Sequence, residues 1–166
     1  DTVTPFPIIM AEGTPINISK TETHSQIENL VVTDDGIMHV AWIDDSNVLY
    51  AQSIDQGASF TEPRMIVDGG LSYSLGSVSL AKTQNVIHLT FTSYDDFFGA
   101  EIFYIRSLDG GLTFSDQKIV SDDDGHNSYS STITTDGFNR VGIAWSNQIA
   151  VGQKSRFTMS ENNGDS

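Results

Sequence analysis

Short runs in which apolar and polar residues alternate recur along the chain. Their period near two predicts β-strands rather than amphipathic helices. Three such runs are each followed, after a turn rich in Asp, Asn and Gly, by a second run that ends near an aromatic residue. Asp, Asn and Gly tolerate the backbone angles of tight hairpins. The paired runs are 27–33 with 37–42, 75–82 with 86–91, and 129–135 with 140–145.

Each pair of runs continues into a third run and then a short corner of common pattern. The first two corners read Ser-x-Asp-x-Gly-x-x-Phe, and the third has Asn at the Asp position, with its aromatic position falling after Ser166. The corners begin roughly 50 residues apart, which is a repeat spacing. Their residues are Ser53, Asp55, Gly57 and Phe60; Ser107, Asp109, Gly111 and Phe114; and Ser160, Asn162 and Gly164.

A fourth run follows the first two corners, so each repeat holds four strands. Four antiparallel strands in about 50 residues, repeated in tandem, are typical of a β-propeller blade. We therefore expect an all-β fold with three blades of a larger ring, with six blades as the expected total. The expected units are a lone fourth-position strand at 15–20, blade one at 21–67, blade two at 68–120, and an incomplete blade three at 121–166.

The corner pattern resembles the Asp box, or BNR repeat, of sialidase-like propellers in the neuraminidase superfamily. In an Asp box the corner closes a hairpin. The Ser and Asp side chains hydrogen-bond to backbone N–H groups, and the Gly adopts backbone angles that other residues resist. The resemblance also implies that the active site of such a protein lies on the face opposite the corners. Sialidases bind their substrate's carboxylate with three arginines, and they add an acid/base Asp and a Tyr activated by Glu.

The four arginines of this chain do not fit that arrangement. Arg64, Arg106 and Arg156 fall on expected strands, and Arg140 falls on the corner side. We therefore expect a module without catalytic residues of its own. Any sialidase or related glycoside hydrolase activity would need residues outside this chain.

Loops of the face opposite the corners carry the candidate binding residues. They combine carboxylates with aromatic rings and a histidine, and Tyr94 lies among them. Adjacent Phe97 and Phe98 would stack on a sugar, anchor a protein partner, or pack on their own blade. The candidate binding residues are Asp44, Asp45, Tyr73, Asp95, Asp96, Phe97, Phe98 and His126.

An Asp-rich loop at 122–127 also suggests a cation site. Asp122 and Asp124 supply hard oxygen ligands of the kind that Ca²⁺ prefers. The alternative is a solvated turn rich in Asp and Asn. By contrast, His39 and His88 hold equivalent strand positions, and this repetition indicates packing rather than metal binding.

Charge narrows the range of partners. The chain has 8 Lys and Arg against 22 Asp and Glu, a net charge of −14, and such a surface repels phosphate backbones and anionic lipids. Nucleic acid is therefore not an expected partner. No apolar segment reaches the roughly 18 residues of a membrane span. The chain also has no cysteine, so disulfides are excluded.

These observations favour a secreted, periplasmic or cell-surface propeller module that binds or scaffolds a glycan or protein. No signal peptide is visible. One alternative is a fragment of a sialidase-type glycoside hydrolase, and another is a Ca²⁺-stabilised adhesion or assembly protein. The expected structural partners are the remaining blades in cis, or a second copy that closes the ring.

Overall fold

The computed structural model describes residues 15–22, 24–70, 73–95, 99–121 and 125–166. These residues form three antiparallel sheets and contain no helix, so none of them lies in a helix able to cross a membrane. The expected all-β class is confirmed. Sheet one contains β1 (Ser25–Val32), β2 (Met38–Asp44), β3 (Asn47–Ser53) and β4 (Arg64–Asp68); sheet two contains β5 (Tyr73–Lys82), β6 (Ile87–Asp95), β7 (Gly99–Ser107) and β8 (Lys118–Ile119); sheet three contains β9 (Ser128–Thr135), β10 (Val141–Gln148) and β11 (Gln153–Ser160).

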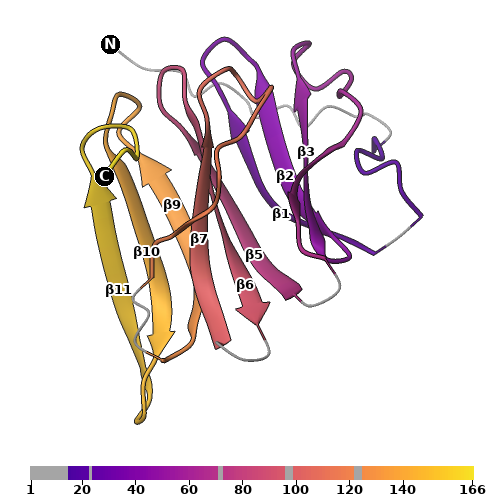
Figure 1. The fold of residues 1–166 in the computed structure, drawn as a ribbon. Helices are drawn as coiled ribbons and strands as arrows, with labels where there is room; N and C mark the ends of the chain where they lie inside the picture. The colour runs from indigo at the N-terminus through magenta and orange to yellow at the C-terminus, as the bar shows by residue number, and fades with distance from the viewer. Residues whose placement is uncertain (1–14, 23, 71–72, 96–98, 122–124) are drawn as a thin grey trace, which may run out of the picture.

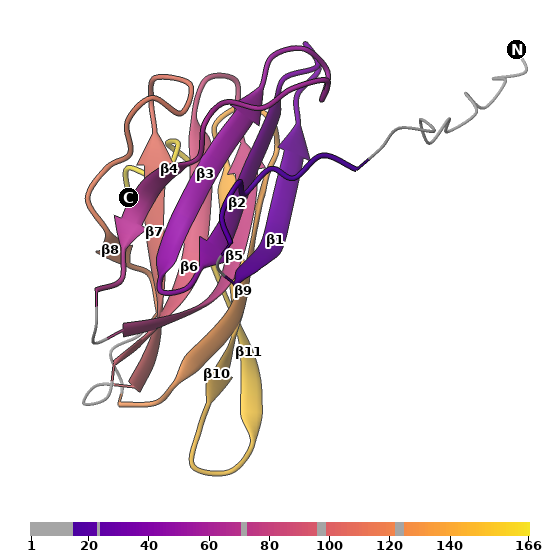
Figure 2. The same ribbon diagram turned by 90° about the vertical axis from the view of Figure 1, so that its right-hand side faces the viewer.

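The three sheets stand face to face in chain order, with sheet two in the middle (Figure 1). Their first strands lie together, since β5 contacts both β1 and β9. We call the end that carries the three corners the corner end, and it lies at the top of Figure 1. The opposite end, where β2, β6 and β10 finish, is the loop end. The view in Figure 2 shows the strands of sheet one running across the face of sheet two.

Apolar side chains fill the two spaces between the sheets. Ile43 and Tyr50 of sheet one pack with Leu89 and Phe91 of sheet two in one core cluster. A second cluster joins the other face of sheet two to sheet three, and it includes the buried Trp145. Alternation along each strand lets sheet two bury both of its faces, since successive side chains point to opposite sides. The middle sheet is therefore the structural centre of the chain.

Residues 15–20, the expected lone strand, form no strand among the described residues, and its expected partner lies outside this chain, so this assignment stays a prediction. A strand is defined by its ladder of hydrogen bonds, and no sheet of the described residues offers this segment a partner. Instead Ile18 packs against Val40, Trp42 and Ala51 on the outer face of sheet one. The three sheets otherwise fall within the expected ranges, except that β4 ends at Asp68, one residue later than expected.

The corners share one set of hydrogen bonds. In the first corner, the Ser53 hydroxyl accepts the Gly57 N–H at 2.8 Å, and the Asp55 carboxylate accepts the N–H and hydroxyl of Ser59 at 2.9 and 2.6 Å. The second corner repeats these bonds. In the third, Asn162 accepts the N–H of Ser166 but donates its amide to that residue's hydroxyl. Asparagine therefore preserves the corner while reversing one bond.

Sheets one and two each contact the corner of the sheet that follows. His39 and Tyr50 of sheet one are hydrogen-bonded at 2.6 Å, and the Tyr50 ring lies so close to Gly111 that a Cβ there would overlap it. His88 and Tyr104 of sheet two repeat the pair at 2.7 Å. The Tyr104 ring lies over the glycine of the third corner, Gly164, in the same way. We call this repeated arrangement the tyrosine clasp.

Arginines reinforce both clasps. Arg64 of β4 donates to the backbone carbonyls of Gly111 and Leu112 in the second corner. Arg106 of β7 donates to the carbonyl of Asn163 at 2.6 Å and pairs with a carboxylate of the third corner. Burial lowers the pKa of His39 and of His88 to about 4, so both imidazoles stay neutral at pH 7.

A bulge interrupts the first strand of every sheet. The register of β1 with β2 shifts between Ile27 and Asn29, and that of β5 with β6 shifts between Leu75 and Val78. The pairing of β9 with β10 shifts at the equivalent place, where Ser130 adopts a positive φ of 54°. An extra residue bends and twists a strand. The three bulges therefore lie toward the loop ends of β1, β5 and β9, and each strand stays paired beyond its bulge.

Candidate functional site

Asp44 and Asp45, two of the predicted binding residues, have different environments at the loop end. The Asp44 carboxylate is buried and accepts the hydroxyl protons of Thr21 and Ser25 at 2.7 and 2.6 Å. It ties the segment before β1 to the end of β2. Asp45 is exposed in the following turn, with a φ of 52° and its N–H on the His24 carbonyl at 3.2 Å. Asp45 is therefore the accessible carboxylate of this turn.

The other predicted residues are only partly described. His126 is half-buried in the loop before β9. Tyr73 and Asp95 pair with one another in the β5–β6 ladder, and their side chains lie outside the described part of the chain. The residues that lie wholly outside it are Asp96, Phe97, Phe98, Asp122 and Asp124. Among the described residues, no group of three or more His, Asp or Glu side chains is placed to hold a metal ion.

Two tyrosines from different sheets meet at the loop end. Tyr94, near the end of β6, and Tyr129, near the start of β9, have ring centroids 5.9 Å apart and planes inclined by 33°. Tyr94 lies against the bulge of β5, where a Cβ on Gly76 would come within 2.8 Å of its ring. Tyr94 is 37% exposed. Partial burial, with a smaller contribution from Tyr129, raises the pKa of Tyr94, so its phenol stays protonated at neutral pH.

Amide side chains border this tyrosine pair. The Tyr129 hydroxyl donates to the Gln148 side-chain oxygen at 3.2 Å, and the Asn127 amide approaches the same oxygen at 3.4 Å. Asn127 is itself held by the Ala100 N–H at 2.9 Å, and a Cβ on Gly99 would overlap it. The junction of sheets two and three thus presents an aromatic surface beside oriented amide groups. Such a combination suits a ligand with both apolar faces and hydroxyl groups.

Glu101 is a buried acid at the loop end, and its contacts connect parts of sheet two. Ser121 donates its hydroxyl to the Glu101 carboxylate and accepts the Ile102 N–H at 2.9 Å. Glu101 is 8% exposed, and its contacts tie β7 to the segment after β8. These bonds anchor the edge of sheet two at the loop end, beside the tyrosine pair.

None of the four arginines lies in a loop at this end. Arg64 and Arg106 contact the corners, Arg140 precedes β10 at the corner end, and Arg156 lies within β11. The sequence-based assignment of the arginines is therefore confirmed. It missed the partnership of Tyr94 with Tyr129 and Gln148, because the pair joins residues of two sheets whose stacking the sequence does not display.

No protein-family model matches the chain, and no curated protein sequence matches it. Several solved structures match the chain. The Hadza microbial sialidase Hz136 aligns with a TM-score of 0.68 at 15% identity, over 85% of this chain and 36% of that one. A polysaccharide lyase of family PL25, an ulvan lyase bound to -[GlcA(1-4)Rha3S]-, aligns with a TM-score of 0.63 at 12% identity, over 82% of this chain and 41% of that one.

The K499G mutant of NanB sialidase from Streptococcus pneumoniae gives a TM-score of 0.59 at 14% identity, over 85% of this chain and 22% of that one. The chain therefore has a sialidase-like β-propeller fold and spans less than half the length of these structures. At such identities the likeness concerns the fold alone.

Proposed function

We propose that this chain is a carbohydrate-binding part of a sialidase-like propeller, and that Tyr94 and Tyr129 form its sugar platform. The observation that carries the proposal is the partly exposed pair of Tyr94 and Tyr129, bordered by Asn127 and Gln148 at the loop end. The apolar face of a pyranose stacks on an aromatic ring, while its hydroxyl groups exchange hydrogen bonds with amides.

The preferred ligand is a neutral glycan. Asp45 is exposed at the same end, and the chain carries a net charge of −14. This charge repels sialic acids and uronic acids. A sialidase-type reaction would need an arginine cluster for the substrate carboxylate, and the arginines of this chain lie elsewhere. Binding without catalysis is thus the function that the residues support best.

The test is a glycan array followed by calorimetry with the best neutral ligand and its sialylated counterpart. Tyr94→Ala should weaken binding of the neutral ligand at least tenfold, about 1.4 kcal/mol, and Tyr94→Phe should retain most of the affinity. Phe138→Ala is the matched control, because Phe138 is 66% exposed in the β9–β10 turn at the corner end. Equal affinity of wild type and Tyr94→Ala would contradict the proposed platform.

A sialidase-type hydrolase that includes further blades is the second candidate, favoured by the two sialidases among the structural neighbours. The same panel separates the candidates. Tighter binding of the sialylated ligand, or release of sialic acid from a chromogenic substrate, would favour the hydrolase over the neutral-glycan module.

A further inference from the structure

A pocket lies between sheets one and two, on the side of sheet two that faces sheet one. Its volume is about 280 Å³. An apolar protein cavity of about 150 Å³ accepts a benzene ring, so this pocket has room for a somewhat larger molecule. Its lining combines apolar side chains with a carboxylate, a hydroxyl and an amide, and we call it the Phe91 pocket. The residues that line it include Leu75, Phe91, Phe103, Asp68, Ser93 and Gln117.

Phe91 is smaller than the residues that hold the same place in the other two sheets. In each sheet, one residue of the second strand pairs with the serine of that sheet's own corner, and this pairing identifies equivalent positions. Four residues after it stand Trp42 in sheet one, Phe91 in sheet two and Trp145 in sheet three. All three side chains are buried. An indole is larger than a phenyl ring, so Phe91 leaves space that a tryptophan would fill.

Ser93 is likewise the smallest residue at the next position on the same side of the strand. Sheet one has Asp44 there and sheet three has Asn147, and both are buried. Asp44 accepts the hydroxyl proton of Ser25 at 2.6 Å. The Asn147 amide approaches the Ser128 hydroxyl at 3.4 Å, so in both sheets this side chain reaches the start of the first strand. Two smaller side chains on one face of β6 therefore coincide with the pocket.

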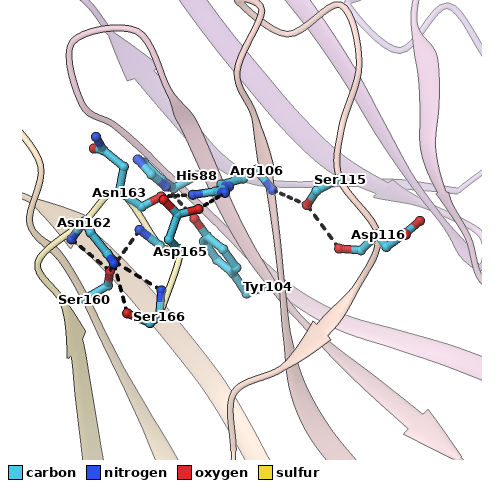
Figure 3. A network of polar contacts seen from close by, with 11 residues as sticks. His88, Tyr104, Arg106, Ser115, Asp116, Ser160, Asn162, Asn163, Asp165 and Ser166 are labelled. Atoms are coloured by element: carbon cyan, nitrogen blue, oxygen red, sulfur yellow. Dashed lines mark hydrogen bonds and ion pairs between the residues drawn. The ribbon is translucent and has the colours of Figure 1, made fainter.

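Asp68, at the loop end of β4, gives the pocket a negative charge. Its carboxylate is exposed, and the Oδ1 atom accepts the Gly70 N–H at 2.9 Å. The arginines of the two flanking sheets are engaged at the corner end, where Arg64 donates to carbonyls of the second corner. Arg106 reaches the third corner, donating to the Asn163 carbonyl at 2.6 Å and pairing with a carboxylate (Figure 3). Among the described residues, no Lys or Arg lines the pocket.

We propose that the Phe91 pocket binds a small organic ammonium ion that carries a hydroxyl group. The cation lies against the rings of Phe91 and Phe103, whose centroids are 5.5 Å apart, and it pairs with Asp68. Aromatic rings attract cations, and the attraction is stronger where water is excluded. The Ser93 hydroxyl and the Gln117 amide supply hydrogen bonds for the ligand hydroxyl. The net charge of −14 also attracts cations to the protein.

The probes are choline and neohexyl alcohol, which has the choline skeleton with carbon in place of the charged nitrogen. Calorimetry with the 166-residue protein should give choline a Kd of about 1 mM or lower, and the neutral alcohol should bind about tenfold more weakly or worse. Asp68→Asn should weaken choline binding roughly threefold and leave the alcohol unchanged, because the amide keeps the bond to Gly70 but loses the charge. Equal affinity for the two probes, or no choline binding at about 10 mM, would overturn the proposal.

Two further variants fill the pocket with residues that the protein uses at the equivalent positions. Phe91→Trp introduces the residue of sheets one and three, and Ser93→Asn introduces that of sheet three. Each should weaken choline binding about tenfold or more, and Ser93→Asn, at a half-buried position, serves if Phe91→Trp does not fold. Phe138→Trp, at the 66% exposed Phe138 of the β9–β10 turn, is the matched control and should bind choline as the wild type does.

Wild-type affinity in the filling variants would place choline elsewhere on the protein and would also overturn the proposal. The pocket lies between sheets one and two, whereas the sugar platform joins sheets two and three. The inference therefore does not depend on the sugar platform, and either proposal can fail without the other.

Discussion

Gly110 and Gly111 stand side by side in the second corner, and both have a positive φ, of 71° and 91°. Only Gly111 faces another sheet. A Cβ on Gly110 would meet nothing within 4 Å, whereas a Cβ on Gly111 would overlap the hydroxyl and ring of Tyr50. Substitutions at the two glycines therefore separate two costs in stability. Gly110 reports the cost of a side chain at a positive φ, and Gly111 reports that cost together with the disruption of the tyrosine clasp.

The expected losses of stability differ for the two alanine variants. A left-handed conformation costs an L-residue about 1–2 kcal/mol, and Gly110→Ala should lose about that amount. Gly111→Ala bears the same loss and also displaces Tyr50, which is 1% exposed and hydrogen-bonded to His39. Overpacking and a lost buried hydrogen bond add roughly 2–4 kcal/mol.

Urea unfolding measures this difference directly, with the buried indoles of Trp42 and Trp145 as fluorescent reporters. In a Tyr50→Ala background the extra loss at Gly111 should disappear, because the double-mutant cycle removes the partner of the clash. Equal losses for Gly110→Ala and Gly111→Ala in the wild-type background would refute the clasp as a source of stability.

Three other perturbations have expected outcomes. Stability should fall as pH drops from 6.5 toward 4. Unfolded histidine gains a proton in that range, whereas folded His39 and His88, with pKa values near 4, do not. A double His→Gln variant should flatten the slope of the free energy of unfolding against pH, as measured with urea. Asp109→Ala should lower Tm more than Asp109→Asn, since Asn162 preserves the third corner; equal Tm values would contradict the corner bonds. Arg106→Met should speed amide exchange at 163–165, and unchanged exchange would leave Arg106 without a role in holding that corner.

The acidic corners titrate in a lower range, which begins near about pH 5. Hydrogen bonds from the Ser59 hydroxyl and N–H lower the pKa of Asp55 to about 2, and Thr113 does the same for Asp109. A depressed carboxyl pKa contributes stability that is present above the unfolded value of 3.8 and lost as pH falls toward 2. The loss between pH 6.5 and about 5 therefore reports the histidines.

The strands and corners were predictable because they depend on local chemistry. Alternation identified the strands, and Ser, Asp and Gly at fixed offsets identified the hairpin corners. The repeated positions of His39 and His88 also indicated a packing role correctly. Their tyrosine partners were not recognised, because each clasp joins a tyrosine to the corner glycine of the next repeat, 61 residues later for Tyr50 and 60 residues later for Tyr104.

The bulges and the tyrosine platform were not predicted. Gly76 was a visible signal for the bulge in β5, but the bulge in β9 contains Ser130 and no glycine. Such a bulge depends on how the strand meets its neighbour rather than on the residue itself. The contact between Tyr94 and Tyr129 depends on the bulges and on the order of the sheets, so it could not be predicted from the sequence.

The tyrosine clasp has a direction along the chain. In both copies the histidine, tyrosine and arginine come earlier in the sequence than the corner they hold. During synthesis the histidine, tyrosine and arginine of each clasp therefore leave the ribosome before the corner that they contact. Domains fold from the N-terminus as they emerge, and this order allows each new hairpin to dock on a neighbour whose gripping residues have already been made.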